Sequence, residues 1–96
     1  MDLSQLLSEL SAAPGISGYE APVRDVIRAA WEGLADEFTV DGLGTLLATQ
    51  QGSGAEPRRR ILVTAHMDEI GLMVTRIEGD FLRVTNVGGG SRPRSA

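Results

Sequence analysis

The feature that most constrains the fold is an apolar run at residues 61–65, which is followed at once by a cluster of polar residues from His66 to Glu69. A continuous apolar run of this length is typical of a strand that is buried on both faces. Such a strand needs neighbours at its edges and a layer over each face. The sequence therefore predicts an α/β fold in which two helices pack on a partial mixed sheet.

Hydrophobic periodicity predicts the remaining elements. Four leucines between Leu3 and Leu10 lie on one helical stripe, and Pro14 with Gly15 ends that helix. A second helix is expected to end at Leu34. Ser17 has the spacing of an N-cap residue, but Pro22 would then lie past the first turn and remove a helical hydrogen bond, so the helix is expected to begin later. The predicted strands are 38–40, 45–50, 70–77 and 81–87, with turns at 41–44 and 79–80 and a disordered tail at 88–96.

Composition sets the size and excludes several kinds of site. The chain has 96 residues, no cysteine and one histidine. It is long enough for one small domain, which we expect to bury somewhat over ~60% of the surface of its unfolded chain. Disulfides, thiolate metal sites and a cysteine nucleophile are excluded, as is a metal site that needs two imidazoles from this chain.

Charge and hydropathy limit the partners. The formal net charge is −4, and the arginines at 58–60 form the main basic cluster, which we interpret as a solvated lead-in to the apolar run. A contact with phosphate or RNA is the alternative for that cluster, but the basic surface expected of a nucleic-acid-binding protein is absent. No apolar segment approaches the ~20 residues of a membrane span, and no signal peptide is recognisable. We expect a soluble cytoplasmic protein.

The chemistry-bearing residues directly follow the apolar run. In extended chain His66 and Asp68 project to the same side, because side chains alternate with period two. One imidazole nitrogen can then bind a metal while the carboxylate accepts the other ring N–H. A structural histidine with satisfied hydrogen bonds is the alternative interpretation of this spacing. Asp68 and Glu69 could form a simple charged turn or a carboxylate pair for acid–base catalysis, although adjacent carboxylates suit glycoside cleavage poorly.

Four segments together resemble one enzyme family. They are residues 13–20, 23–24, 41–44 and 65–71, and their order and spacing resemble those of the M42 metallo-aminopeptidases across residues 3–87. That family includes the tetrahedral aminopeptidases, the glutamyl aminopeptidases and proteins labelled endoglucanase M. The resemblance implies that this chain is the N-terminal part of a zinc-peptidase-type catalytic domain, whose later strands lead toward an inserted β domain.

The resemblance also implies the site and its chemistry. His66 would bind one of two divalent metal ions, zinc or cobalt, and Asp68 would be the catalytic residue that supports the imidazole. In the intact family a metal-bound water attacks the first peptide bond after a glutamate takes its proton, and the subunits form homo-oligomers. The bridging aspartate, that glutamate and the second histidine would lie downstream. We therefore expect at most weak metal binding and no activity from this chain alone.

Two other functions remain open on the sequence. The chain resembles only part of an M42 peptidase, with residues 1–87 as a partial catalytic domain, so a non-catalytic α/β module that needs a partner chain is one alternative. A carbohydrate hydrolase is the other, suggested by the endoglucanase label and by the neighbouring carboxylates of Asp68 and Glu69. The expected substrates are peptides, with no nucleic acid and no membrane as partner.

Overall fold

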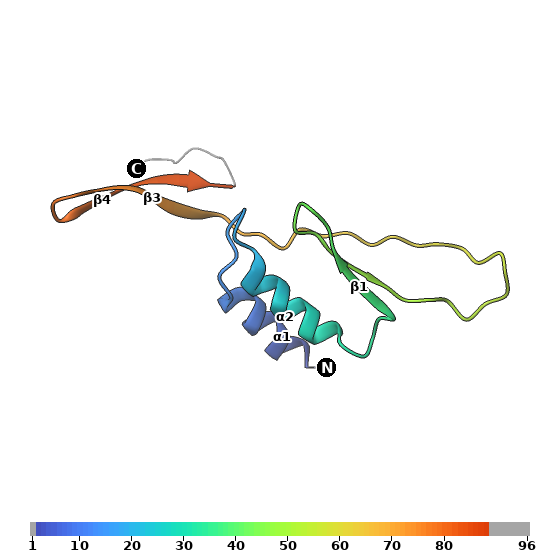
Figure 1. The fold of residues 1–96 in the computed structure, drawn as a ribbon. Coiled ribbons are helices and arrows are strands. Elements are labelled where there is room, and N and C mark those ends of the chain that lie inside the picture. The colour runs from blue at the N-terminus through green and yellow to red at the C-terminus, as the bar shows by residue number, and fades with distance from the viewer. Residues whose placement is uncertain (1, 89–96) are drawn as a thin grey trace.

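The computed structural model describes residues 2–88, in which two helices are followed by two β-hairpins (Figure 1). The helices α1 and α2 lie side by side, and the hairpins β1–β2 and β3–β4 extend from them to opposite sides. The predicted disorder of the tail concerns residues that lie, apart from Gly88, outside the described range. Between residues 2 and 88 no helix is long and apolar enough to cross a membrane.

Helix α1 spans Leu3–Ala12, as the leucine stripe predicts. It begins at Asp2, whose Oδ1 accepts hydrogen bonds from the backbone N–H groups of Ser4 (3.0 Å) and Gln5 (3.3 Å). These two bonds satisfy donors that have no partner inside the first helical turn. The helix ends before Pro14, whose ring and missing N–H do not fit a helix interior.

Helix α2 spans Ala21–Trp31 and follows Glu20 as its N-cap residue. Pro22 therefore falls in the first turn, where a missing N–H costs no helical hydrogen bond, and the start lies later than a cap at Ser17 would place it. The predicted continuation to Leu34 is wrong. The chain turns after Trp31 because Gly33 adopts a positive φ of 82°, a left-handed conformation that glycine reaches without steric cost.

The first hairpin pairs β1 (Glu37–Val40) with β2 (Leu46–Thr49) in antiparallel register, with Phe38 opposite Ala48. It is attached to α2 through two arginines of that helix. Arg24 donates from Nη1 to the carbonyl of Gly44 at 3.0 Å, and the guanidinium of Arg28 lies 4.6 Å from the centre of the Phe38 ring.

The second hairpin pairs β3 (Gly71–Glu78) with β4 (Phe81–Val87), also antiparallel. Gly79 makes the turn with a φ of 63°, at the position where the sequence predicts it. The register shifts between Val74 and Arg76, which marks a β-bulge.

Two sequence predictions about the sheet are wrong. Residues 61–65 form no strand and are exposed, with Ile61, Leu62 and Val63 at 88%, 80% and 87% of full accessibility. The four strands make two separate antiparallel pairs and no mixed sheet. The physical reason is that a strand buried on both faces needs flanking strands and covering layers, and residues 2–88 place none beside this run.

The molecule is elongated and has little core. Its dimensions are 65 × 26 × 25 Å and its radius of gyration is 18.1 Å, against roughly 12–13 Å for a compact domain of this length. The accessible surface is 8058 Å², so folding buries roughly 45% of the surface of the unfolded chain instead of the predicted ~60%. Val23 is the one buried hydrophobic side chain among the described residues, and it packs against Gly15.

Candidate functional site

Two segments that lie far apart in the sequence meet where the candidate site forms. The loop between α1 and α2 runs beside the chain that enters β3, and the backbone N–H of Glu69 donates to the carbonyl of Gly15 at 2.8 Å. Ile16 and Glu69 form an isolated parallel β-bridge. The motif at 13–20 and the motif at 65–71 therefore form one structural unit.

Glycine makes this contact possible. A Cβ atom added to Gly71 would lie 2.2 Å from Cγ2 of Ile16, and one added to Gly15 would lie 2.8 Å from Cγ1 of Val23. Both distances are far below van der Waals contact, so a side chain at either position would push the segments apart. These close approaches were not foreseen from the sequence, in which the two glycines are the only available signal.

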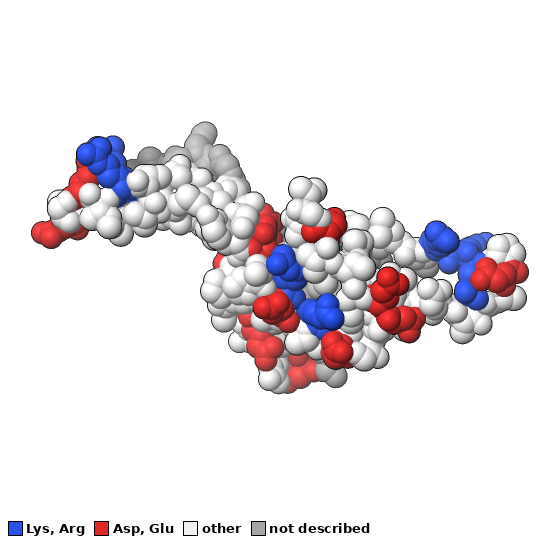
Figure 2. Space-filling model, viewed as in Figure 1, with Lys and Arg blue, Asp and Glu red and all other residues white. Residues whose placement is uncertain are grey.

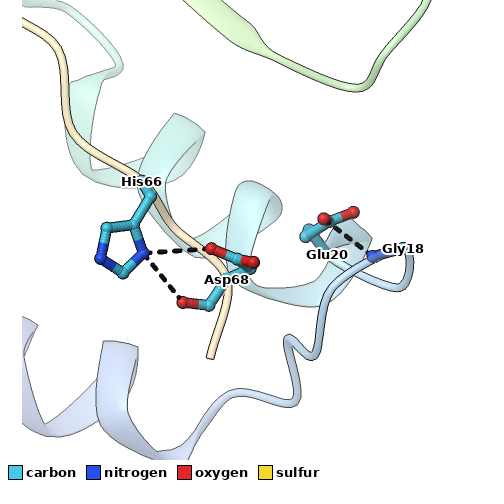
Figure 3. A network of polar contacts seen from close by, with 4 residues as sticks. All are labelled: Gly18, Glu20, His66 and Asp68. Carbon is cyan, nitrogen blue, oxygen red and sulfur yellow. Dashed lines mark hydrogen bonds and ion pairs between the residues drawn. The ribbon is translucent and has the colours of Figure 1, made fainter. Parts of the chain in front are cut away.

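The structure brings His66 and Asp68 together, in keeping with the period-two spacing. Nδ1 of His66 lies 3.0 Å from Oδ1 of Asp68 and 3.1 Å from the carbonyl oxygen of the same residue, as Figure 3 shows. Both partners are acceptors, so Nδ1 carries the proton. The Nε2 atom of the ring faces away from Asp68, on a side chain that is 86% exposed.

Two other acidic residues near this pair, Glu20 and Glu69, have structural contacts of their own. Glu20 accepts a hydrogen bond from the backbone N–H of Gly18 at 2.9 Å, which holds the loop ahead of α2 (Figure 3). Glu69 takes part through its backbone, in the bridge to Ile16. Within the described range no group of three or more histidine, cysteine or acidic side chains is placed to hold a metal ion.

Asp41 belongs to the predicted turn at 41–44 and has a structural role there. Its Oδ1 accepts hydrogen bonds from the backbone N–H groups of Thr45 (3.0 Å) and Leu43 (2.9 Å). These bonds, first that from Thr45, lower the pKa of the Asp41 carboxyl below its ordinary value of 3.8. The same turn presents the Gly44 carbonyl to Arg24.

Comparison with known proteins identifies the family. The model of the family described as M42 glutamyl aminopeptidase matches residues 44–94, more than half of the chain. The chain belongs to the M42 family. The M42 resemblance of the four sequence segments is thereby confirmed.

Relatives and solved structures agree with this assignment. A lysyl aminopeptidase from Pyrococcus furiosus is 40% identical over 87 residues, which are 88% of this chain and 24% of that protein. The crystal structure of a TET aminopeptidase from a marine sediment thaumarchaeon has a TM-score of 0.79 and 34% identity, over 90% of this chain and 23% of the other. The crystal structure of an endoglucanase from Thermotoga maritima has a TM-score of 0.76 and 45% identity, over 88% of this chain and 27% of the other.

The M42 chain thus spans about a quarter of the length of the proteins it matches. Its α/β fold, with two helices and two small antiparallel sheets, is the fold of the corresponding part of the TET aminopeptidase. The elongated arrangement of these elements is therefore one that this chain shares with a segment of a larger M42 protein.

Proposed function

We propose that residues 1–87 are part of the catalytic domain of a metal-dependent M42 aminopeptidase, which releases N-terminal residues from peptides. The observation that carries the proposal is the contact between Nδ1 of His66 and Asp68, which leaves Nε2 exposed. The aminopeptidase names of the relatives support peptides as substrates. The division into a domain at 1–87 and a tail at 88–96, and the cytoplasmic location, stay predictions.

In this proposal His66 supplies one metal ligand through Nε2. Asp68 positions the ring and fixes its tautomer, because its carboxylate and its carbonyl both accept from Nδ1–H. A zinc or cobalt ion, or the pair of ions that the family resemblance implies, would supply the activation of water. The described residues do not fit a complete site, since a catalytic zinc has three protein ligands and no three histidine, cysteine or acidic side chains between residues 2 and 88 are gathered to hold a metal ion.

Activity would therefore require ligands from outside this segment. The test uses the present chain together with the Pyrococcus lysyl aminopeptidase from which the matching segment has been deleted. We expect no release of amino acids from aminoacyl anilides by either part alone, and cobalt- or zinc-dependent release by the mixture. His66→Ala should abolish that activity, and Asp68→Asn should lower it by about 10–100-fold through loss of the oriented ring.

The controls separate binding from catalysis. Glu56→Gln lies in the exposed loop and should leave the activity of the mixture unchanged. Binding of the two parts without activity, or full activity with His66→Ala, would contradict the proposed role of His66. Calorimetry of the isolated chain with Zn²⁺ should give weak binding that His66→Ala hardly changes, and tight stoichiometric binding would contradict the incomplete site.

Carbohydrate hydrolysis is the second candidate, and the name of the Thermotoga protein favours it. The local geometry does not support it, because the Asp68 carboxylate is engaged with His66 and is not paired with that of Glu69 across a cleft. An assay of the same mixture on carboxymethylcellulose decides between peptide and carbohydrate hydrolysis. Cleavage of cellulose without release of amino acids would reverse the order of the two candidates.

A further inference from the structure

One peptide group links the imidazole of His66 to the loop between α1 and α2. The carbonyl oxygen of Asp68 lies 3.1 Å from Nδ1 of His66. The N–H of Glu69 donates to the carbonyl of Gly15 at 2.8 Å. That carbonyl and that N–H belong to the same peptide group, which joins Asp68 to Glu69. The group therefore accepts from the histidine ring on one edge and donates to the loop on the other.

The planarity of this peptide group couples its two hydrogen bonds. The bond between Asp68 and Glu69 is trans, and in a trans peptide group the C=O and the N–H point in opposite directions within one plane. An acceptor that fixes the direction of the Glu69 N–H therefore also fixes the direction of the Asp68 carbonyl. Because hydrogen bonds in a chain polarise one another, the bond to Gly15 also makes that carbonyl a stronger acceptor. Both effects favour the proton on Nδ1 of His66.

The carbonyl of Gly15 is itself held from two sides. Gly15 is buried, and a Cβ added to it would lie 2.8 Å from Cγ1 of Val23, the α2 side chain that is 4% exposed. On the other side Ile16 packs against Gly71 at the start of β3, where an added Cβ would lie 2.2 Å from Cγ2 of Ile16. The carbonyl between Gly15 and Ile16 is therefore fixed with respect to both α2 and β3.

We propose that the backbone carbonyl of Gly15 is a positioning group for His66, and that it orients the ring through the peptide group between Asp68 and Glu69. Its role is to hold the ring proton on Nδ1 and so to leave Nε2 unprotonated. The inference rests on the proposed function, since Nε2 of His66 is the atom that would bind the metal. The orientation of the ring is measurable without any metal.

The test is nitrogen NMR of the full chain, labelled with ¹⁵N in histidine. His66 is the one histidine of the sequence, so its two ring nitrogens need no further assignment. Their shifts in the neutral ring give the ratio of the Nδ1–H to the Nε2–H tautomer, and we expect the Nδ1–H form to dominate. Gly15→Ala should lower that ratio by about fivefold, the effect of losing one neutral hydrogen bond. A dominant Nε2–H tautomer in the unmodified chain would overturn the proposal.

Two rescues separate ring orientation from general damage. The φ of Gly15 is not positive, so contact with Val23 is what opposes an alanine there. Gly15→Ala/Val23→Ala should recover the tautomer ratio although it removes a buried valine and lowers stability. Gly71→Ala displaces the loop from the other side, with Ile16→Ala as its rescue. Gly42→Ala meets nothing within 4 Å and should leave the ratio unchanged.

The electrostatic surroundings of the ring are the same in all these variants. Figure 2 shows acidic side chains where the β3–β4 hairpin leaves the helices. The substitutions at glycine, valine and isoleucine carry no charge, so these acidic side chains are retained. A change in the tautomer ratio would therefore report the direction of the hydrogen-bond acceptors. A ratio that Gly15→Ala lowers and Val23→Ala does not recover would contradict the proposed contact.

A further variant separates the backbone carbonyl from the carboxylate. Oδ1 of Asp68 also lies 3.0 Å from Nδ1 of His66. Asp68→Ala removes that acceptor and keeps the backbone carbonyl, so the preference for the Nδ1–H tautomer should be weaker. It should still fall when Gly15→Ala is added. If Gly15→Ala has no effect in this background, the carboxylate alone orients the ring and the proposal is wrong.

Activity distinguishes this inference from the proposed function. In the mixture with the deleted aminopeptidase, Gly15→Ala should lower the release of amino acids by about 10-fold, and Val23→Ala should restore it. A mixture that His66→Ala inactivates, but in which Gly15→Ala changes neither activity nor tautomer ratio, would overturn the inference while the proposed function would stand. An inactive mixture with the expected tautomer shifts would contradict the proposed function and support the orientation of the ring by Gly15.

Discussion

Individual glycines decide how closely the two halves of the candidate site approach. Gly71 leaves no room for a Cβ beside Ile16, whose Cγ2 would lie 2.2 Å from it. A Cβ added to Gly42 would meet nothing within 4 Å, and the φ of Gly42 is not positive, so this residue provides a matched control. The spacing of His66 and Asp68 could be predicted from two-residue alternation, whereas this contact joins residues about fifty positions apart and no local pattern encodes it.

The substitution Gly71→Ala should therefore separate the loop at 15–18 from the entry to β3. Overpacking of this kind costs ~1–3 kcal/mol, which should speed hydrogen exchange of the Glu69 amide by ~10-fold or more. Gly42→Ala should leave that exchange unchanged, and the double variant Gly71→Ala/Ile16→Ala should recover much of the loss. Normal protection of Glu69 in Gly71→Ala would mean that the loop accommodates the methyl group.

Asp41 should make the first turn sensitive to acid. Its pKa is lowered in the folded chain by the N–H groups of Thr45 and Leu43, so the ionised form stabilises the turn above the unfolded pKa of 3.8. That contribution should fall as the pH drops through the lower folded pKa. A carboxyl carbon NMR titration should give a midpoint below 3.8 for Asp41, and Asp41→Asn should remove this pH dependence. A midpoint that is not lowered would contradict the two hydrogen bonds.

At the scale of elements, sequence patterns predicted the helices and turns that depend on contacts between residues close together in the chain. The leucine stripe of α1, the Asp41–Gly42 turn and the Gly79 turn lie where the sequence places them, because each depends on residues a few positions apart. The apolar run at 61–65 has the composition of a doubly buried strand. The flanking strands and covering layers that such a strand needs are not among the described residues, so the run forms no strand there.

The attachment of β1–β2 to α2 should depend on Arg24. Its hydrogen bond to the Gly44 carbonyl is partly buried, and bonds from a charged donor contribute about 1.5–3 kcal/mol. Arg24→Ala should therefore increase amide exchange throughout β1 and β2 while α1 stays unchanged. Asp25→Ala, on the exposed side of the same helix, serves as control. Equal exchange in both variants would mean that the contact between Arg28 and Phe38 suffices.

At the scale of the whole molecule, an elongated chain with one buried hydrophobic side chain among the described residues should unfold with little heat. Compact domains absorb about 0.7 kcal/mol per residue near 60 °C. Because this chain buries roughly 45% of its unfolded surface, where ~60% is usual at this size, calorimetry should give a clearly smaller value per residue. The enthalpy should rise when the deleted aminopeptidase binds. A sharp transition of normal enthalpy in the isolated chain would indicate a compact domain.

The bridge between Ile16 and Glu69 should tolerate changes in the length of the chain that connects the two residues. It closes a loop of roughly fifty residues, and the entropy of closing a flexible loop grows only with the logarithm of its length, so doubling the loop costs about 0.6 kcal/mol. The exposed stretch at 51–57 forms its hydrogen bonds and its ion pair with Asp36 and Arg58, and none that the described residues show with His66 or Asp68. An insertion there should lengthen the path between the two halves of the site while leaving their meeting point almost as stable as before.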